Sequence, residues 1–309
     1  MSEKKSRPSL ESTLKSTDTE ETIDLVFYRP IGYYWALLFH KLGVVPNAVT
    51  IASIFIGVAA GVMFYFDDLI YNIIGMLLLI WANMYDSADG QLARISDKKS
   101  EIGRALDGIA GDLWFYSIYF FICLRLHSEW SYWIWILAAV SGFCHSRQAA
   151  MADYYRNVHL FFLKGKSGSE LDNSKQQYAQ SRSLAWKGNL IPKLYHYFYG
   201  DYTAAQEQLS PKFQRFLALL YKCYGEQAPQ TLADDFRQAS KPLMKYANIL
   251  SFNTRVFVLF IALFVRQPWI YFVFELTILN GLLIYMIYRH ETLSNRFYLR
   301  LKKHSGGEE

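Results

Sequence analysis

Apolar residues in this chain gather into long blocks with little interruption by charge. The blocks at 44–66 and 69–85 contain no Asp, Glu, Lys or Arg, and four further blocks contain only one to three. Segments of about 17–25 apolar residues are long enough to cross a bilayer as helices. The pattern therefore predicts an all-α integral membrane bundle with six transmembrane helices, at 44–66, 69–85, 104–124, 130–152, 248–265 and 267–288.

The segments around these blocks predict the remaining domain organisation. Residues 1–22 are polar and predict a disordered tail, whereas 23–42 set aromatic side chains among basic ones and predict an amphipathic helix in the membrane interface. We expect a helical insert on the cytoplasmic side at 156–246. The predicted divisions are 1–22 (tail), 23–155 (interfacial helix and four spans), 156–246 (insert) and 247–309 (two spans and a C-terminal tail).

Two parts of the insert have the character of interfacial segments. Apolar side chains recur at steps of three and four over 213–224, so we expect that helix to lie along the inner leaflet beside the active-site mouth. The aromatic run at 195–199 also suits the membrane interface.

The distribution of charge gives the predicted bundle an orientation. With an even number of spans, both termini lie on one side, and 30 of the 32 Lys and Arg residues fall on that side, leaving only Arg125 and Arg266 opposite. Basic residues favour the cytoplasmic face, so the termini and the insert are predicted to be cytoplasmic in a multi-pass protein of the cell (inner) membrane. The net charge of +5 reflects this bias, and no ladder of basic and aromatic residues indicates nucleic-acid binding.

Four carboxylates stand at the edges of the second and third apolar blocks. They are Asp86, Asp89, Asp107 and Asp112. Burying such charges without partners costs several kcal/mol each, as an order of magnitude, so the cluster requires cations. On helices, Asp86 and Asp89 share a face, and hard oxygen ligands of this kind favour Mg²⁺ or Mn²⁺. We expect two such ions.

The spacing of these residues resembles the signature of the CDP-alcohol phosphotransferase family, D-x2-D-G-x2-A-R-x8-G-x3-D-x3-D. The resemblance implies a membrane-bound homodimer in which two metal ions hold the pyrophosphate of a CDP-linked alcohol while an acceptor hydroxyl displaces CMP. By the same resemblance, Asp86, Asp89 and Asp107 are metal ligands. The nucleotide site would be lined by Gly90, Ala93, Arg94 and Gly103, with Asn47 and Thr50 of a Pro-Asn-x-x-Thr stretch nearby.

The last position of the signature departs from the family pattern. The regular place of the fourth aspartate, assigned there as metal ligand and general base, holds Gly111, and Asp112 follows one residue later. In a regular helix a step of five residues turns by about 500°, so Asp112 would need a π-bulge to share a face with Asp107. We expect Asp112 to act as ligand and base through such a bulge; the alternative is that it pairs elsewhere and water or another group takes the proton.

Two arginines are candidates for binding the substrate. Arg147 resembles an arginine that the family carries near the end of the fourth span, and Arg255 opens the fifth span; either could hold an anion or simply anchor its helix. They favour CDP-diacylglycerol as donor and an anionic soluble acceptor such as inositol phosphate. The alternative is a CDP-linked head group transferred to diacylglycerol or a ceramide-type lipid. Glu275, inside the sixth span, should have a buried partner or a water-lined position.

Two other classes of function compete with the enzyme. A non-catalytic scaffold that kept the fold would account for the displaced fourth aspartate. A transporter would account for charges within the membrane, but no inverted repeat is evident in the sequence.

Overall fold

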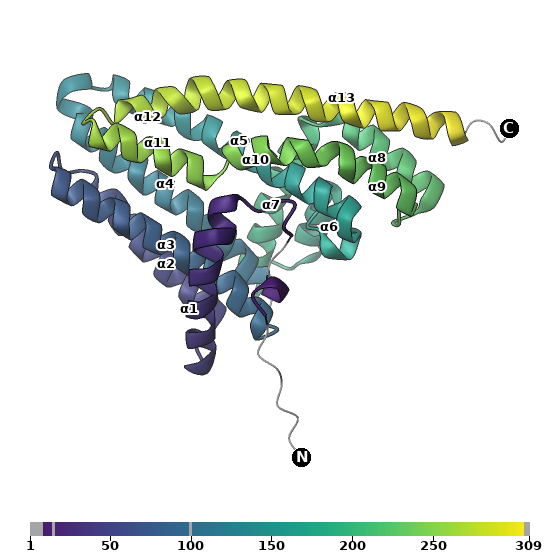
Figure 1. The fold of residues 1–309 in the computed structure, drawn as a ribbon, viewed down its shortest axis with the longest axis horizontal. Coiled ribbons are helices and arrows are strands. Elements are labelled where there is room, and N and C mark those ends of the chain that lie inside the picture. The colour runs from purple at the N-terminus through teal and green to yellow at the C-terminus, as the bar shows by residue number, and fades with distance from the viewer. Residues whose placement is uncertain (1–8, 14–15, 99–100, 306–309) are drawn as a thin grey trace, which may run out of the picture. The chain divides into compact units, whose positions relative to one another are not determined.

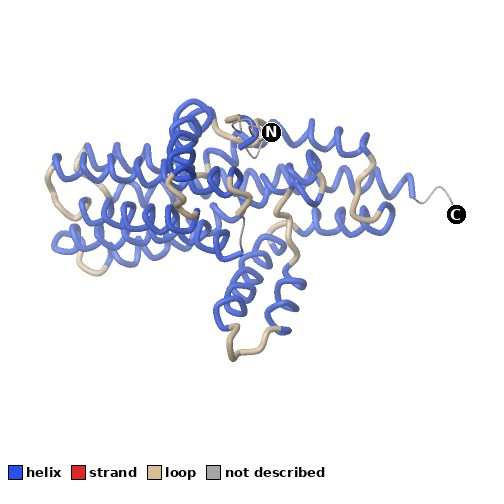
Figure 2. Tube along the Cα trace, turned by 90° about the horizontal axis from the view of Figure 1, so that it is seen from below, coloured by secondary structure: helices blue, strands red, loops and turns tan. Residues whose placement is uncertain are grey.

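The computed structural model describes residues 9–13, 16–98 and 101–305, and its regular structure there is helical, with no β-strand among the described residues (Figures 1 and 2). The chain divides into two compact units, one comprising 1–143 and 256–274 and the other comprising 144–255 and 275–309. The helix α5 (Trp133–Lys164) and the helix α11 (Phe252–Phe264) contribute residues to both units. The prediction of an all-α protein is confirmed.

The first unit contains the N-terminal helices and the two helices that carry the acidic motif. Its helices are η1 (Glu11–Thr13), the π-helical η2 (Asp24–Tyr28), α1 (Arg29–Lys41), α2 (Pro46–Met63), α3 (Leu69–Ile95), α4 (Glu101–Trp130) and α12 (Trp269–Phe274), together with parts of α5 and α11.

The second unit contains the insert and the C-terminal helix. Its helices are η3 (Lys166–Gly168), α6 (Ser174–Ser183), α7 (Leu190–Gln208), α8 (Pro211–Tyr224), α9 (Gln230–Ser240), η4 (Lys241–Leu243), α10 (Met244–Ile249), the π-helical η5 (Glu275–Leu279) and α13 (Asn280–Ser305), together with the rest of α5 and α11.

Five helical stretches of the described chain are long and apolar enough to cross a membrane. They are Pro46–Met63, Leu69–Ile95, Leu106–Trp130, Gln230–Phe264 and Trp269–His304. The sixth predicted span, at 130–152, forms the helix α5 but is not among the five. His145, Arg147 and Gln148 make the second half of that segment polar.

Small residues allow α2 to approach α4 closely. Gly57 and Gly61 stand four residues apart on α2, and a Cβ on Gly57 would lie 2.1 Å from the Trp114 ring of α4. A Cβ on Gly61 would lie 2.3 Å from the hydroxyl oxygen of Ser117, which donates a hydrogen bond to the Val58 carbonyl at 2.9 Å. Paired small residues are a common means of packing membrane helices, and here they bring α2 beside the helix that carries Asp107.

The N-terminal region is partly anchored to the first unit. Residues 1–8 and 14–15 of the predicted disordered tail lie outside the described residues, but Glu20 accepts two hydrogen bonds from Arg29, each 3.0 Å long. The prediction of disorder is therefore corrected for the described part of the tail. The predicted interfacial helix is α1, preceded by η2; Ala36 is buried on the side that packs against α3, and Tyr34 is exposed.

Candidate active site

The acidic motif forms a cluster at the ends of α3 and α4 in the first unit. Asp86 and Asp89 lie three residues apart near the end of α3, and Asp107 lies in the second turn of α4. Each of the three residues offers a carboxylate oxygen, and these oxygens lie within 4.8 Å of one another. We call Asp86, Asp89 and Asp107 the acidic cluster. Asp89 is buried, Asp86 is half-buried and Asp107 is exposed, so the cluster runs from the helix bundle towards its surface.

A hydroxyl group from α2 holds the buried member of the acidic cluster. The Oγ1 of Thr50 donates to Oδ2 of Asp89 at 2.5 Å, whereas the Pro46 carbonyl lies 3.3 Å from the same hydroxyl. A threonine has one hydroxyl proton, so the shorter contact takes it. Thr50 thus orients the Asp89 carboxylate. This position within the acidic motif is compatible with the prediction that Thr50 lies near the nucleotide. Asn47, three residues earlier on α2, is half-buried.

Arg94 lies one turn beyond Gly90 on the same helix as the cluster. A Cβ on Gly90 would meet the Arg94 guanidinium at 3.5 Å, and the charges that act on Arg94 include those of Asp89 and Asp107. Its Nε is buried and has no hydrogen-bond partner among the described residues. Arg94 therefore has one N–H donor near the carboxylates that the described chain does not use. The other predicted nucleotide-lining residues, Ala93 and Gly103, are both half-buried.

The predicted π-bulge between Asp107 and Asp112 is absent. The helix α4 is α-helical throughout Glu101–Trp130, so the five-residue step leaves Asp112 about 140° around the helix from Asp107. Asp112 is half-buried and is not part of the acidic cluster. We expected a π-bulge to bring Asp112 to the face of Asp107, where it could act as metal ligand and general base. That expectation was wrong, because α4 has no such bulge. Gly111 holds the regular position, and a Cβ there would meet no atom within 4 Å.

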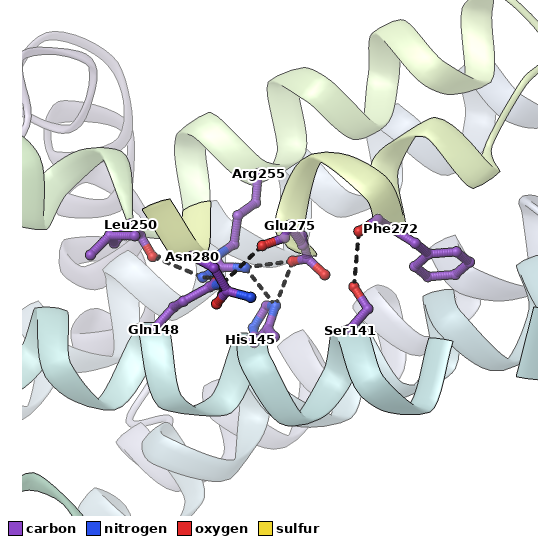
Figure 3. A network of polar contacts seen from close by, with 8 residues as sticks. All are labelled: Ser141, His145, Gln148, Leu250, Arg255, Phe272, Glu275 and Asn280. Carbon is purple, nitrogen blue, oxygen red and sulfur yellow. Dashed lines mark hydrogen bonds and ion pairs between the residues drawn. The ribbon is translucent and has the colours of Figure 1, made fainter. Parts of the chain in front are cut away.

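The second unit contains a buried polar network around Glu275 (Figure 3). Glu275 and Arg255 are 0% and 2% exposed, and NH1 of Arg255 donates to Oε1 of Glu275 at 2.5 Å. Nδ1 of His145 lies 2.9 Å from the same carboxylate oxygen, and the amide of Gln148 donates to the Glu275 carbonyl at 3.0 Å. The buried partner expected for Glu275 is confirmed.

This network also changes the interpretation of Arg255. All three of its guanidinium nitrogens bond to the protein: Nε to the Leu250 carbonyl at 3.2 Å, NH1 to Glu275, and NH2 to Oε1 of Gln148 at 2.8 Å. These contacts favour the alternative that Arg255 anchors its helix, because its charge is compensated by Glu275 and each of its nitrogens is bonded within the fold. Arg147, the other candidate, lies half-buried on α5 in the second unit.

Sequence reasoning missed three members of this network. His145, Gln148 and Asn280 were not assigned to it, although Gln148 also donates to Oδ1 of Asn280 at 2.7 Å. The available signal was Glu275 itself, because a charge inside an apolar block requires partners on neighbouring helices. The π-helical turn lies here, at η5, instead of in α4.

The acidic cluster has the donor set of a divalent-metal site. Three carboxylate groups offer oxygen ligands to one small region, and Mg²⁺ and Mn²⁺ prefer such hard ligands. Three clustered negative charges repel one another unless a cation lies between them. The residues present therefore fit a divalent metal ion.

One comparison with known proteins agrees with this geometry. Residues 43–159, which include α2, α3, α4 and the acidic cluster, match the family model for CDP-alcohol phosphatidyltransferase. A comparison with curated proteins finds no match to the chain. Residues 43–159 therefore form a CDP-alcohol phosphatidyltransferase domain, and the family of that domain consists of transferases of substituted phosphate groups.

Proposed function

We propose that this protein transfers a phosphatidyl group, or a related phospho-alcohol, from a CDP-linked donor to the hydroxyl group of an acceptor. In this reaction the acceptor oxygen forms a bond to the phosphorus that carries the alcohol. The bond from that phosphorus to the bridging oxygen breaks, CMP leaves with that oxygen, and a base takes the hydroxyl proton. The observation that carries the proposal is the acidic cluster, which joins α3 and α4 within the family domain.

Asp86, Asp89 and Asp107 would hold two Mg²⁺ or Mn²⁺ ions. Paired ions of this kind neutralise phosphate charge and stabilise the entering and leaving oxygens. Thr50 keeps the Asp89 carboxylate in place, and the unused Nε donor of Arg94 is suited to a phosphate oxygen.

The nucleotide would lie beside these residues. Gly90, Ala93 and Gly103 have small side chains or none and leave room for it, and Asn47 would lie next to it.

For the substrates, we propose CDP-diacylglycerol as donor and an anionic soluble acceptor such as inositol phosphate. A net charge of +5, concentrated in segments that we place on the cytoplasmic side, supports an anionic acceptor. Arg147 is the proposed acceptor-binding arginine. We further propose that the protein acts as a homodimer in the cell membrane, with its termini and the acidic cluster facing the cytoplasm.

The test is CMP release by the purified full-length protein in lipid nanodiscs. CDP-diacylglycerol would be supplied with inositol phosphate, glycerol phosphate or serine in turn, and CDP-linked head groups with diacylglycerol or ceramide, each with Mg²⁺ and with a chelator. We expect metal-dependent CMP release with one anionic acceptor, and loss of release in Asp89→Asn. CMP release from CDP-linked head groups with diacylglycerol or ceramide, and none from CDP-diacylglycerol, would contradict the substrate assignment.

A matched control distinguishes the loss of a metal ligand from the loss of a negative charge elsewhere on the same part of the chain. Asp97 is exposed, lies just beyond the end of α3 and has a φ of 52°, which asparagine also tolerates. Asp97→Asn should leave CMP release unchanged. If no donor and acceptor pair yields CMP, the protein is the non-catalytic scaffold.

A further inference from the structure

The helix α7 has two faces of different character. Its inner face packs against α6: Nδ1 of His196 lies 2.8 Å from Oε1 of Gln177, and Gly200 lies against the Tyr178 ring. Its outer face carries large apolar side chains that remain exposed. We call this face, with the tryptophan that precedes it, the α7 stripe; it consists of Trp186, Leu190, Ile191, Leu194, Tyr197 and Phe198.

The spacing and exposure of the stripe distinguish it from scattered surface residues. Its five helical members stand at steps that place them on one side of α7, and Ile191 and Phe198 are 70% and 63% exposed. Contiguous exposed apolar surface of this kind marks a binding surface. In contrast, α8 buries the centre of its own apolar face, with Phe213, Phe216 and Leu220 at 0% exposure. The second unit therefore has a packed core from which the α7 stripe is left out.

The charged residues that precede and accompany the stripe, within 175–200, are all basic. Residues 175–200 contain Lys175, Arg182, Lys187 and Lys193 and no Asp or Glu, and the first three of these cations are exposed. Lys193 bonds to the carbonyls of Ser181 and Leu184 at 2.8 Å and lies 4.9 Å from the centre of the Trp186 ring. The first acidic residue in the chain after the stripe is Asp201, which is exposed on the same side of α7 and accepts a hydrogen bond from the Tyr178 hydroxyl at 2.6 Å.

We propose that the α7 stripe inserts into the interface of an anionic membrane leaflet. Aromatic and aliphatic side chains flanked by lysine and arginine are the composition of helices that lie at this depth, and the cations complement anionic head groups. A second copy of the chain is a poorer partner, because its own stretch 175–200 is equally basic and offers Asp201 as the acidic residue that directly follows it, whereas an anionic leaflet offers many negative head groups. The insert would then be a second membrane-binding element, in addition to the spanning helices.

The proposal can be tested by photo-crosslinking in the full-length protein. Photoreactive benzoylphenylalanine would replace Ile191 or, independently, Phe198, and the protein would be reconstituted in nanodiscs of phosphatidylcholine with or without phosphatidylglycerol. Adducts would be identified by mass spectrometry after irradiation. Gln208 is a matched control, because it is exposed near the end of the same helix, beyond the stripe.

We expect lipid adducts from positions 191 and 198 and not from position 208. In the anionic nanodiscs, Lys187→Glu should lower the adduct yield about five-fold or more, since each basic side chain strengthens attachment to an anionic surface by about that factor. In neutral nanodiscs the same substitution should change little. Adducts to a second protein chain, or no lipid adduct at either stripe position, would overturn the proposal. The readout does not depend on CMP release and so stands apart from the proposed reaction.

Discussion

The acidic cluster and the Glu275 network both place charged side chains in apolar helices, but they are built in opposite ways. The acidic cluster brings three carboxylate groups within 4.8 Å, and Thr50 donates to Asp89 within it. In the network, Glu275 is paired with Arg255, and both groups are further bonded by neighbouring side chains. The network supplies its own counter-charge, whereas the cluster has an excess of negative charge.

This difference separates a structural site from a functional one. A buried ion pair with all its donors used makes a helix bundle specific, but it offers no group to a ligand. A cluster of like charges is unfavourable by itself and becomes favourable when a cation binds. The two sites should therefore respond oppositely when a charge is removed.

Asp89→Asn should lower activity more than any other substitution considered, and it should raise the stability of the metal-free protein. Removing one ligand should lower metal-dependent CMP release by about 10³-fold, because metal ions stabilise the transition state by several kcal/mol. Without metal, the same substitution should raise the melting temperature by relieving repulsion in the cluster, and it should abolish any increase in melting temperature on adding Mg²⁺. Full CMP release in Asp89→Asn would contradict the metal-site assignment.

Arg255→Met should unfold the protein more readily. It leaves the Glu275 carboxylate buried without its ion partner, which costs about 3–5 kcal/mol of unfolding free energy. Denaturation in detergent micelles would measure this loss, and the double variant with Glu275→Gln should recover part of it. Arg300→Met, which breaks the exposed pair with Asp235, should cost less than about 1 kcal/mol. Similar losses in the two single variants would contradict the contrast between buried and exposed pairs.

Thr50→Val should weaken the acidic cluster without changing its charge. Groups that orient metal ligands commonly contribute 10–100-fold to metal affinity or activity, so we expect a loss of about that size in CMP release. The Mg²⁺ dependence of CMP release should shift to higher concentration. Thr50→Ser keeps the hydroxyl and should retain most activity; equal loss in both variants would show that packing, and not the hydrogen bond to Asp89, is responsible.

Substitutions at Gly111 and Asp112 should have the smallest effects. Gly111→Asp restores the regular spacing of the signature at a position where an added Cβ meets no atom within 4 Å, so Mg²⁺ affinity should increase by up to about ten-fold. Asp112→Asn should lower CMP release by less than about ten-fold, because α4 turns Asp112 away from Asp107. A loss in Asp112→Asn as large as in Asp89→Asn would restore Asp112 as the general base.

The sequence predicted the acidic cluster well because its information is local. Asp86 and Asp89 share a face by helical spacing alone, and the family signature relates them to Asp107. The same resemblance placed Thr50 near the nucleotide, but the hydrogen bond from Thr50 to Asp89 was visible only in the structure. The sequence also showed that Glu275 needs a partner, but Arg255 and His145 lie 20 and 130 residues away in the chain. Helical periodicity does not specify which distant helices meet.

The insert shows the same limit. Apolar periodicity was evident in α8, and we expected its apolar face to meet the membrane. Instead, the Phe216 ring stacks on the rings of Phe162 and Phe236, so that face is part of the core of the second unit. In α7 the apolar residues of the stripe remain exposed. An amphipathic pattern shows that one face of a helix is apolar. It does not identify whether that face is buried against the protein core, a membrane or another partner.

The sequence by itself determined the membrane-embedded helical class, the resemblance of the acidic motif to one enzyme family and the three carboxylates of the acidic cluster. These depend on block length, on spacing within single helices and, for Asp107 on the neighbouring helix, on the family signature. The tertiary structure decided which buried charges are compensated, where the π-helical turn lies, that Asp112 is turned away from the cluster, and which amphipathic face stays exposed. Each of these depends on packing between segments far apart in the chain, where the free energy of burial belongs to the whole fold and not to any one segment.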